Sequence, residues 1–231
     1  MNKQNRRVAV VGVATAKMEK DMPMTVRDVA HRLIREAVED AGITKDDVDG
    51  LIVTPPGMGG LPSFMFPHSL ADYLGMPTRN LAMIESGGAT ATLAVKYALD
   101  EIALGRSRFC VVFALDRRAM KRMKTEFNHF MRESVTRMVN VYGPFDGPYG
   151  VAAPIPLYAM SAQRYMHEYG VEAEAIAEVP VGLRRNASEN PDALYREPLV
   201  LEEVLASPMI SPPIHLLECS VFCFGAAAVV L

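Results

Sequence analysis

The sequence predicts an α/β protein in which buried strands alternate with helices. Two apolar runs at 8–13 and 51–54 flank a segment at 25–41 whose apolar residues recur at helical spacing. A second strand–helix–strand pattern follows within 80–116. Strands joined through helices in this way are typical of a parallel sheet that is covered by helices.

The first helix has clear boundary signals. Thr25 can cap its N-terminus, with Asp28 three residues further on, and Gly42 can end it. The strand at 51–54 ends at two prolines, and a short helix is expected at 68–74. The N-terminal half therefore has the order strand, helix, strand, helix.

The central segment turns sharply between a strand at 81–84 and a helix at 89–104. Ser86 lies in this turn, where the helix N-terminus provides free N–H groups and the positive end of the helix dipole. Ser86 is therefore the candidate functional residue. The helix carries almost no charge before Lys96, so we expect its N-terminal half to be buried on all sides.

The rest of the chain ends in an apolar strand at 226–231. Chain termini usually lie at the surface, so a buried final strand predicts that a second half exists, in another polypeptide or in a lost C-terminal region. The segment 117–137 is rich in Arg and Lys, which favours a solvated helix face over a site for a phosphorylated carrier. An irregular loop is expected at 142–156, and helices at 157–169, 173–183 and 200–206.

Composition narrows the class of protein. A formal net charge of −3 gives no electrostatic reason to expect nucleic acid or an anionic membrane as a partner. No apolar run approaches the roughly 20 residues that span a bilayer. Cys110, Cys219 and Cys223 do not form a disulfide framework or a metal-binding pattern, so we expect structural thiols, no metal site and a cytoplasmic location.

Three stretches together resemble the thiolase superfamily, and within it the sterol-carrier-type thiolases and the acetyl-CoA acetyltransferase-like lipid-transfer proteins. They are VAVVGVATA near the N-terminus, ESGGATATLAVKYALDEIALGRSRFCVVFAL in the centre and SPPIHLLECSVFCFGAAAVVL at the end. The resemblance lies in their order and spacing and covers nearly the whole chain.

The resemblance implies the N-terminal half of a thiolase-like fold, with a mixed five-stranded sheet and a buried central helix. The core of this domain would comprise 7–116 and 224–231, and an inserted loop and helical region would comprise 117–223. In the family this region shapes the acyl-CoA pocket and helps to form the dimer. The helix after Ser86 would pack between two sheets, against its counterpart from the second half.

By the same resemblance, Ser86 stands where thiolases carry the nucleophilic cysteine, and Gly87 and Gly88 would bind substrate beside it. A serine is a much weaker nucleophile than a thiolate, and the return from an oxygen ester to a thioester is uphill. The family's two histidines and second cysteine belong to the second half, and His215 matches neither histidine. Phe224-Gly225 replaces the usual Asp-Gly.

We therefore expect an enzyme of lipid metabolism that acts on CoA thioesters. It would be an acyltransferase of the acetyl-CoA C-acyltransferase type or a carbon–carbon bond lyase. Acyl-CoA would be the substrate, with no permanently bound cofactor. A C-terminal half or a partner chain would complete the site, in a homodimer or a hetero-oligomer. The alternative is a non-catalytic subunit that binds acyl-CoA or scaffolds a partner.

Two other classes of protein fit the residues less well. A serine hydrolase would use Ser86 as nucleophile, His215 as base and Asp192 as acid, but Ile84 occupies the first glycine position of Gly-x-Ser-x-Gly. A phosphate-binding loop at 57–60 would follow a strand, but no Lys-Ser/Thr pair comes after it.

Overall fold

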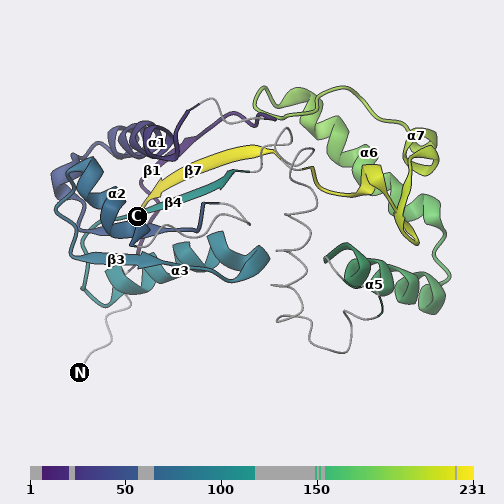
Figure 1. Ribbon diagram of the computed structural model, residues 1–231, viewed down its shortest axis with the longest axis horizontal. Coiled ribbons are helices and arrows are strands. Elements are labelled where there is room, and N and C mark those ends of the chain that lie inside the picture. Colours follow the sequence, from purple (N-terminus) through teal and green to yellow (C-terminus); the bar gives the residue numbers. More distant parts are fainter. Residues whose placement is uncertain are drawn as a thin grey trace. The chain divides into compact units, whose positions relative to one another are not determined.

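The computed structural model describes residues 7–20, 24–56, 65–117, 149, 151, 154–221 and 223–231. The chain divides into two compact units (Figure 1). Met1–Ala119 and Cys223–Leu231 form the first, which we call the sheet unit, and Met120–Phe222 form the second, which we call the helical unit. Among the described residues, no helix is both long enough and apolar enough to cross a bilayer.

The sheet unit is built on a five-stranded mixed sheet with strand order β1-β7-β4-β2-β3. Strand β2 is parallel to both β3 and β4, whereas β7 is antiparallel to β1 and β4. The predicted mixed five-stranded sheet is therefore confirmed. The strands are β1 Gly12–Thr15, β2 Gly50–Val53, β3 Asn80–Met83, β4 Cys110–Arg117 and β7 Phe224–Val230.

Helices cover the two faces of the sheet unequally (Figure 1). Helices α1 (Val26–Asp40) and α2 (Phe66–Leu74) lie on one face, and α3 (Thr90–Ala103) lies on the other. Successive strand residues point to opposite faces, so Leu51 and Val53 pack under α1 and α2 while Ile52 packs against α3. The larger core lies on the side of α1 and α2.

Asp49 aligns the starts of the three neighbouring parallel strands. Its carboxylate accepts hydrogen bonds from the backbone N–H groups of Arg108 (2.9 Å) and Phe109 (3.3 Å). Its carbonyl oxygen accepts from the N–H groups of Arg79 (2.7 Å) and Asn80 (3.0 Å). Because the strands start level, β2, β3 and β4 all end toward the opposite, carboxyl edge of the sheet.

Most predicted elements of this unit are present, with shifted ends. The first strand was predicted at 8–13, which is wrong by several residues, because pairing with β7 runs from Gly12 opposite Val230 to Thr15 opposite Ala227. Helix α1 begins as predicted, and the Thr25 hydroxyl oxygen accepts a hydrogen bond from the Asp28 N–H. Helix α2 starts earlier than predicted, with a proline in its first turn, where no N–H partner is needed.

The helical unit contains three described α-helices and a short hairpin. Helix α6 contains Pro180, as its predicted range did, and it continues beyond the predicted end at 183 to Glu189. The hairpin of β5 (Met209–Ser211) and β6 (Ile214–His215) was not predicted from its proline-rich sequence. The glycine loop at 57–60, nearly all of the basic segment 117–137 and most of the loop 142–156 lie outside the described residues. The helices are α5 Pro154–Tyr169, α6 Ala173–Glu189 and α7 Leu201–Ala206.

The close approach of β1 to α1 requires glycine at position 12. A Cβ atom there would lie 2.1 Å from the Ala37 carbonyl oxygen and 2.8 Å from Ala41 Cβ. We expect Gly12→Ala to lower the free energy of unfolding by about 3 kcal/mol, the upper part of the usual overpacking range. Urea unfolding followed by circular dichroism measures this change.

Gly182→Ala is the matched control, because no atom lies within 4 Å of the added Cβ in helix α6. It should raise the free energy of unfolding of the helical unit by up to about 1 kcal/mol, since alanine favours helix. Equal effects of the two substitutions would contradict the close approach of β1 and α1.

Candidate functional site

The Ser86 turn connects the end of β3 to the start of α3, at the carboxyl edge of the sheet. Ligands of open α/β sheets bind outside this edge. Ser86, Gly87 and Gly88 are all exposed, and residues 87–89 form a single 3-10 turn before α3. The fold thus places the predicted site residues where a ligand can reach them, and their roles in catalysis and substrate binding stay predictions.

Two hydrogen bonds of the Thr90 hydroxyl and one bond between backbone groups close this turn. The Ser86 N–H donates to Thr90 Oγ1 (2.8 Å), and the Thr90 hydroxyl donates to the Gly87 carbonyl oxygen (2.7 Å). The Ala89 N–H donates to the Ser86 carbonyl oxygen (3.2 Å). No hydrogen bond joins the Ser86 hydroxyl to another described residue, so no described base is placed to deprotonate it.

The two glycines leave open space beside Ser86. Gly87 has a φ of +54°, a backbone conformation that favours glycine. A Cβ atom at Gly87 or at Gly88 would have no atom within 4 Å. A ligand can therefore approach the backbone of the turn without meeting another described part of the chain.

The prediction that the first half of α3 is buried on all sides is wrong for this chain. Only Ala94, Ala98 and Glu101 are buried in α3. Ala91, Thr92 and Leu93 are exposed, and Leu93 retains 38% of its accessible surface. The helix packs on β2 and β4 with one side only, since the described part of the sheet unit supplies one sheet and no second layer above α3.

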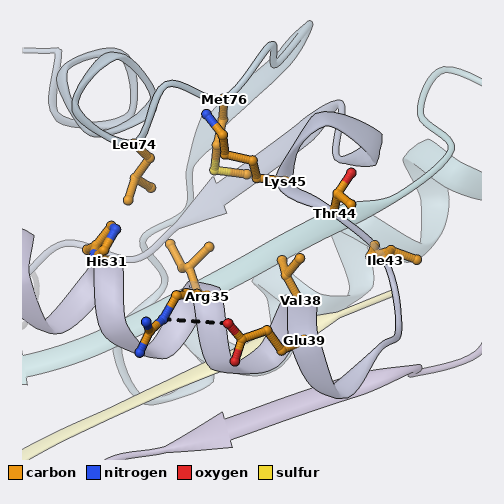
Figure 2. A pocket seen from close by; sticks show the side chains of 10 residues that line it. His31, Arg35, Val38, Glu39, Ile43, Thr44, Lys45, Leu74 and Met76 are labelled. Atoms are coloured by element: carbon orange, nitrogen blue, oxygen red, sulfur yellow. Dashed lines mark ion pairs between the residues drawn. The ribbon is translucent and has the colours of Figure 1, made fainter.

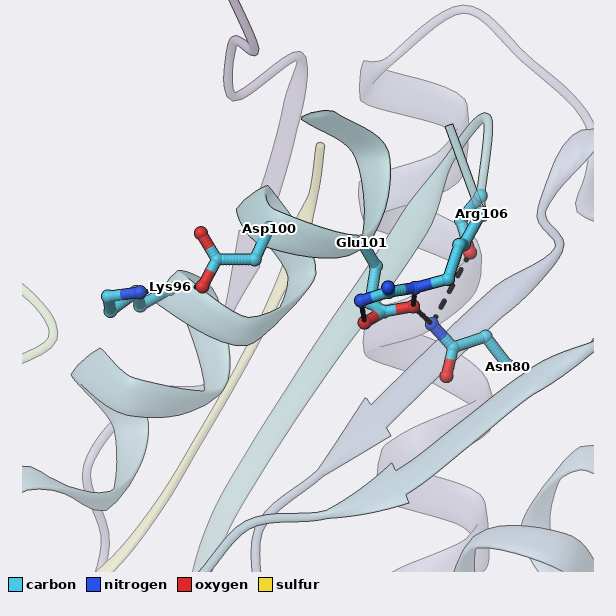
Figure 3. Close-up of polar contacts among 6 residues, drawn as sticks. Asn80, Lys96, Asp100, Glu101 and Arg106 are labelled. Carbon is cyan, nitrogen blue, oxygen red and sulfur yellow. Dashed lines mark hydrogen bonds and ion pairs between the residues drawn. The ribbon is translucent and has the colours of Figure 1, made fainter. Parts of the chain in front are cut away.

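A buried carboxylate joins the start of β3 to the end of α3, far from Ser86 (Figure 3). Glu101, near the end of α3, accepts hydrogen bonds from Asn80 Nδ2 (2.9 Å) at the start of β3 and from Arg106 Nε (2.8 Å). It also accepts from Arg106 Nη2, and it is only 5% exposed. The Arg106 guanidinium holds the pKa of Glu101 below its ordinary value of 4.5.

A separate groove lies beside α1, on the face of the sheet opposite to α3 (Figure 2). It holds about 270 Å³, with Ile34, Val38 and Met76 in its floor. The exposed Arg35–Glu39 ion pair (3.8 Å) is on its rim. The groove lies across the sheet from α3, so it is not part of the Ser86 site.

The hydrolase alternative lacks the expected acid beside its base. His215 Nδ1 lies 3.2 Å from Glu218 Oε2, and the Asp192 N–H instead donates to Asn190 Oδ1. No described hydrogen bond or ion pair joins Asp192 to His215. Sequence reasoning missed Glu218, although its spacing from His215 within one helical turn could have indicated it.

The buried thiol of Cys110 is unreactive. Cys110 lies inside β4, and burial raises the pKa of its thiol to about 11. A thiol with this pKa stays protonated at neutral pH and is a poor nucleophile. Cys110 is therefore not a candidate nucleophile.

Comparisons with known proteins agree on one family. No model of a protein family matches the chain. The chain is 30% identical to an acetyl-CoA acetyltransferase of Methanothermobacter thermautotrophicus, over 98% of this chain and 57% of the relative. It is 27% identical to a 17-hydroxy-3-oxo-4-pregnene-20-carboxyl-CoA lyase of Mycobacterium tuberculosis, over 96% and 56%. A solved structure of an Ltp2-ChsH2(DUF35) aldolase matches with a TM-score of 0.77 and 26% identity, over 96% and 54%.

The fold and these likenesses define a thiolase-type protein. The chain belongs to the thiolase superfamily and corresponds to the N-terminal half of that fold. It spans about half the length of the curated relatives that it matches.

The lowered pKa of Glu101 makes stability depend on pH. A carboxylate with a lowered folded pKa stabilises the protein above its unfolded pKa and loses this contribution as pH falls through the folded value. We expect Glu101→Gln to lower the free energy of unfolding by about 1–3 kcal/mol at pH 7. The difference from the wild type should shrink as pH falls below 4.5.

Asp100→Asn is the control for this experiment. Asp100 pairs with Lys96 at 2.6 Å, but both side chains are more than half exposed (Figure 3). Its loss should cost no more than about 0.5 kcal/mol. Chemical unfolding between pH 3 and pH 7 measures both variants, and a Glu101→Gln difference that stays constant with pH would contradict the assignment.

Proposed function

We propose that this chain is part of a thiolase-fold enzyme that cleaves a carbon–carbon bond in a CoA thioester, with Ser86 as a hydrogen-bond donor rather than a nucleophile. The observation that carries the proposal is the Ser86 hydroxyl itself, which is exposed at the carboxyl edge and has no described base beside it. Likeness to a CoA lyase and to an aldolase supports the same reaction class.

The chemistry of serine favours this choice. The thiolase cycle needs a thiolate that attacks a thioester and then leaves again, and a serine without a base does neither well. In a retro-aldol cleavage a base removes the proton of the β-hydroxyl group, the bond between the α and β carbons breaks, and a ketone or aldehyde leaves. The electron pair moves onto the thioester as an enolate, which is then protonated at the α carbon.

Ser86 is suited to stabilise that enolate. Its hydroxyl can donate to the thioester oxygen, and the N-terminus of α3 places the positive end of a helix dipole behind it. Gly87 and Gly88 would let the thioester approach the backbone, since no described atom lies within 4 Å of either Cβ position. The general base would come from the second half of the enzyme or from a partner chain.

We also propose that a second thiolase half covers the exposed side of α3, within a homodimer or a hetero-oligomer. A second apolar residue is exposed on this side of the sheet, since Val13 of β1 retains 54% of its accessible surface. Val13 is on the side of α3, because its neighbour Gly12 faces α1. Exposed apolar side chains on one face of a sheet are expected where another layer packs.

Replacement of Ser86 separates the possible roles. In the full-length protein with any subunit that co-purifies, we expect Ser86→Ala to lower kcat for cleavage of a β-hydroxyacyl-CoA by about 100-fold, as for loss of one oxyanion donor. KM should change little, and intact-protein mass spectrometry should detect no acyl adduct. Release of the ketone or aldehyde gives the rate.

The alternative outcomes identify the competing functions. An acyl adduct on Ser86 and thiolytic cleavage of a β-ketoacyl-CoA would show an acyltransferase instead. Binding of acyl-CoA without turnover of either substrate would show a non-catalytic subunit, which the unpartnered hydroxyl also allows. Unchanged lyase turnover in Ser86→Ala would remove Ser86 from the chemistry.

A charge introduced on the exposed side of α3 tests whether a second half covers this side. We expect Leu93→Asp to abolish co-purification of a separate second half, or to lower the unfolding midpoint when both halves share one polypeptide, because the charge would become buried. Met24→Asp is the control, since Met24 is 39% exposed outside α3 against 38% for Leu93. Equal behaviour of the two variants in size-exclusion chromatography and thermal unfolding would argue against a covered α3.

A further inference from the structure

The Ser86 turn does not have the hydrogen bonds of an ordinary helix cap. A serine that precedes a helix normally uses its hydroxyl oxygen to accept a hydrogen bond from an N–H two or three residues further on. Ser86 makes no such side-chain bond. Instead, its own N–H donates to the hydroxyl oxygen of Thr90, four residues later.

Thr90 makes two bonds in this turn with one oxygen atom. The oxygen accepts from the Ser86 N–H at 2.8 Å, and the same hydroxyl donates to the Gly87 carbonyl at 2.7 Å. Both a donor and an acceptor are required, which only a hydroxyl group provides at this size. Branching at Cβ also restricts the rotation of a threonine side chain, so the oxygen stays in place.

Few other described side-chain contacts restrain the conformation of the turn. Gly87 and Gly88 have no side chains, and no atom lies within 4 Å of where their Cβ atoms would be. Glycine is the residue with the greatest backbone freedom. The Thr90 hydroxyl is therefore the one described side chain that ties Ser86 and Gly87 to the rigid helix α3.

We propose that Thr90 is a positioning residue for Ser86: by binding the backbone on both sides of the turn, it keeps the Ser86 hydroxyl out of helix capping and available to the thioester oxygen. This inference rests on the proposed function for its chemical consequence. The statement that Thr90 fixes the conformation of the turn depends only on the two hydrogen bonds.

The kinetic test compares two substitutions in two backgrounds. Thr90→Val keeps the shape of the side chain and removes both bonds, whereas Thr90→Ser keeps the hydroxyl. In the full-length enzyme, Thr90→Val should lower kcat about 10-fold with little change in KM, because a small misplacement of a reacting group costs this much or more. Thr90→Ser should stay within about 3-fold of the wild type, since it loses only rotational stiffness.

The Ser86→Ala background shows whether Thr90 acts through Ser86. If it does, Thr90→Val should change kcat by less than about 2-fold once the Ser86 hydroxyl is gone, as expected for two residues in one unit. A full 10-fold loss in this background would overturn the proposal. A Thr90→Ser variant as impaired as Thr90→Val would overturn it as well.

Amide hydrogen exchange gives a readout that needs no substrate. Loss of the Thr90 oxygen should accelerate exchange of the Ser86 N–H by about 10-fold or more through local opening of the turn, with the buried part of α3 unchanged. Thr90→Ser should keep the wild-type rate. Unchanged exchange in Thr90→Val would overturn the positioning role, whereas faster exchange in a protein with no lyase activity would overturn the proposed function alone.

Discussion

The buried carboxylate of Glu101 is the contact that makes β3, the Ser86 turn and α3 one structural unit. It joins the first residue of β3, Asn80, to the end of α3 through an amide, and it joins the next turn through Arg106. A buried charge is costly unless it is paired and hydrogen-bonded, so this arrangement tolerates few alternatives. The strand and the helix are thereby tied at the end far from Ser86.

The opposite end of the same unit is held differently. At the carboxyl edge, the chain reverses through two glycines with open space around them, and hydroxyl-to-backbone bonds from Thr90 take the place of packing. An exposed, lightly packed turn on a rigid strand–helix support is suited to a reactive site, because substrate can reach it while its frame stays in place. The unit thus combines a rigid base with an accessible apex.

The surface of α3 is the physical reason for proposing another layer on this half of the fold. One side of the helix buries Ala94 and Ala98 against the sheet, and the other exposes Leu93 beside small residues. A helix that is apolar nearly all round is stable in a core rather than at a surface. The proposed second half would supply this layer, and the chain covers about half of its relatives' length.

Only part of the candidate site could be predicted from the sequence. Ser86 and its two glycines stand out, because they interrupt an apolar strand just before a helix that carries almost no charge in its first half. Thr90 and Glu101 do not stand out, since each fits a helix position equally well without any partner. Their roles depend on which backbone groups and side chains the turn and the strand bring within hydrogen-bonding distance.

The sequence by itself determined the alternation of strands and helices, the boundaries of α1 and the thiolase resemblance, because hydrophobic periodicity and capping residues act over a few neighbours. Only the tertiary structure decided the register of β1 on β7 and the one-sided burial of α3. These features depend on contacts between elements, and one residue's neighbours across a sheet are not encoded in its own local pattern.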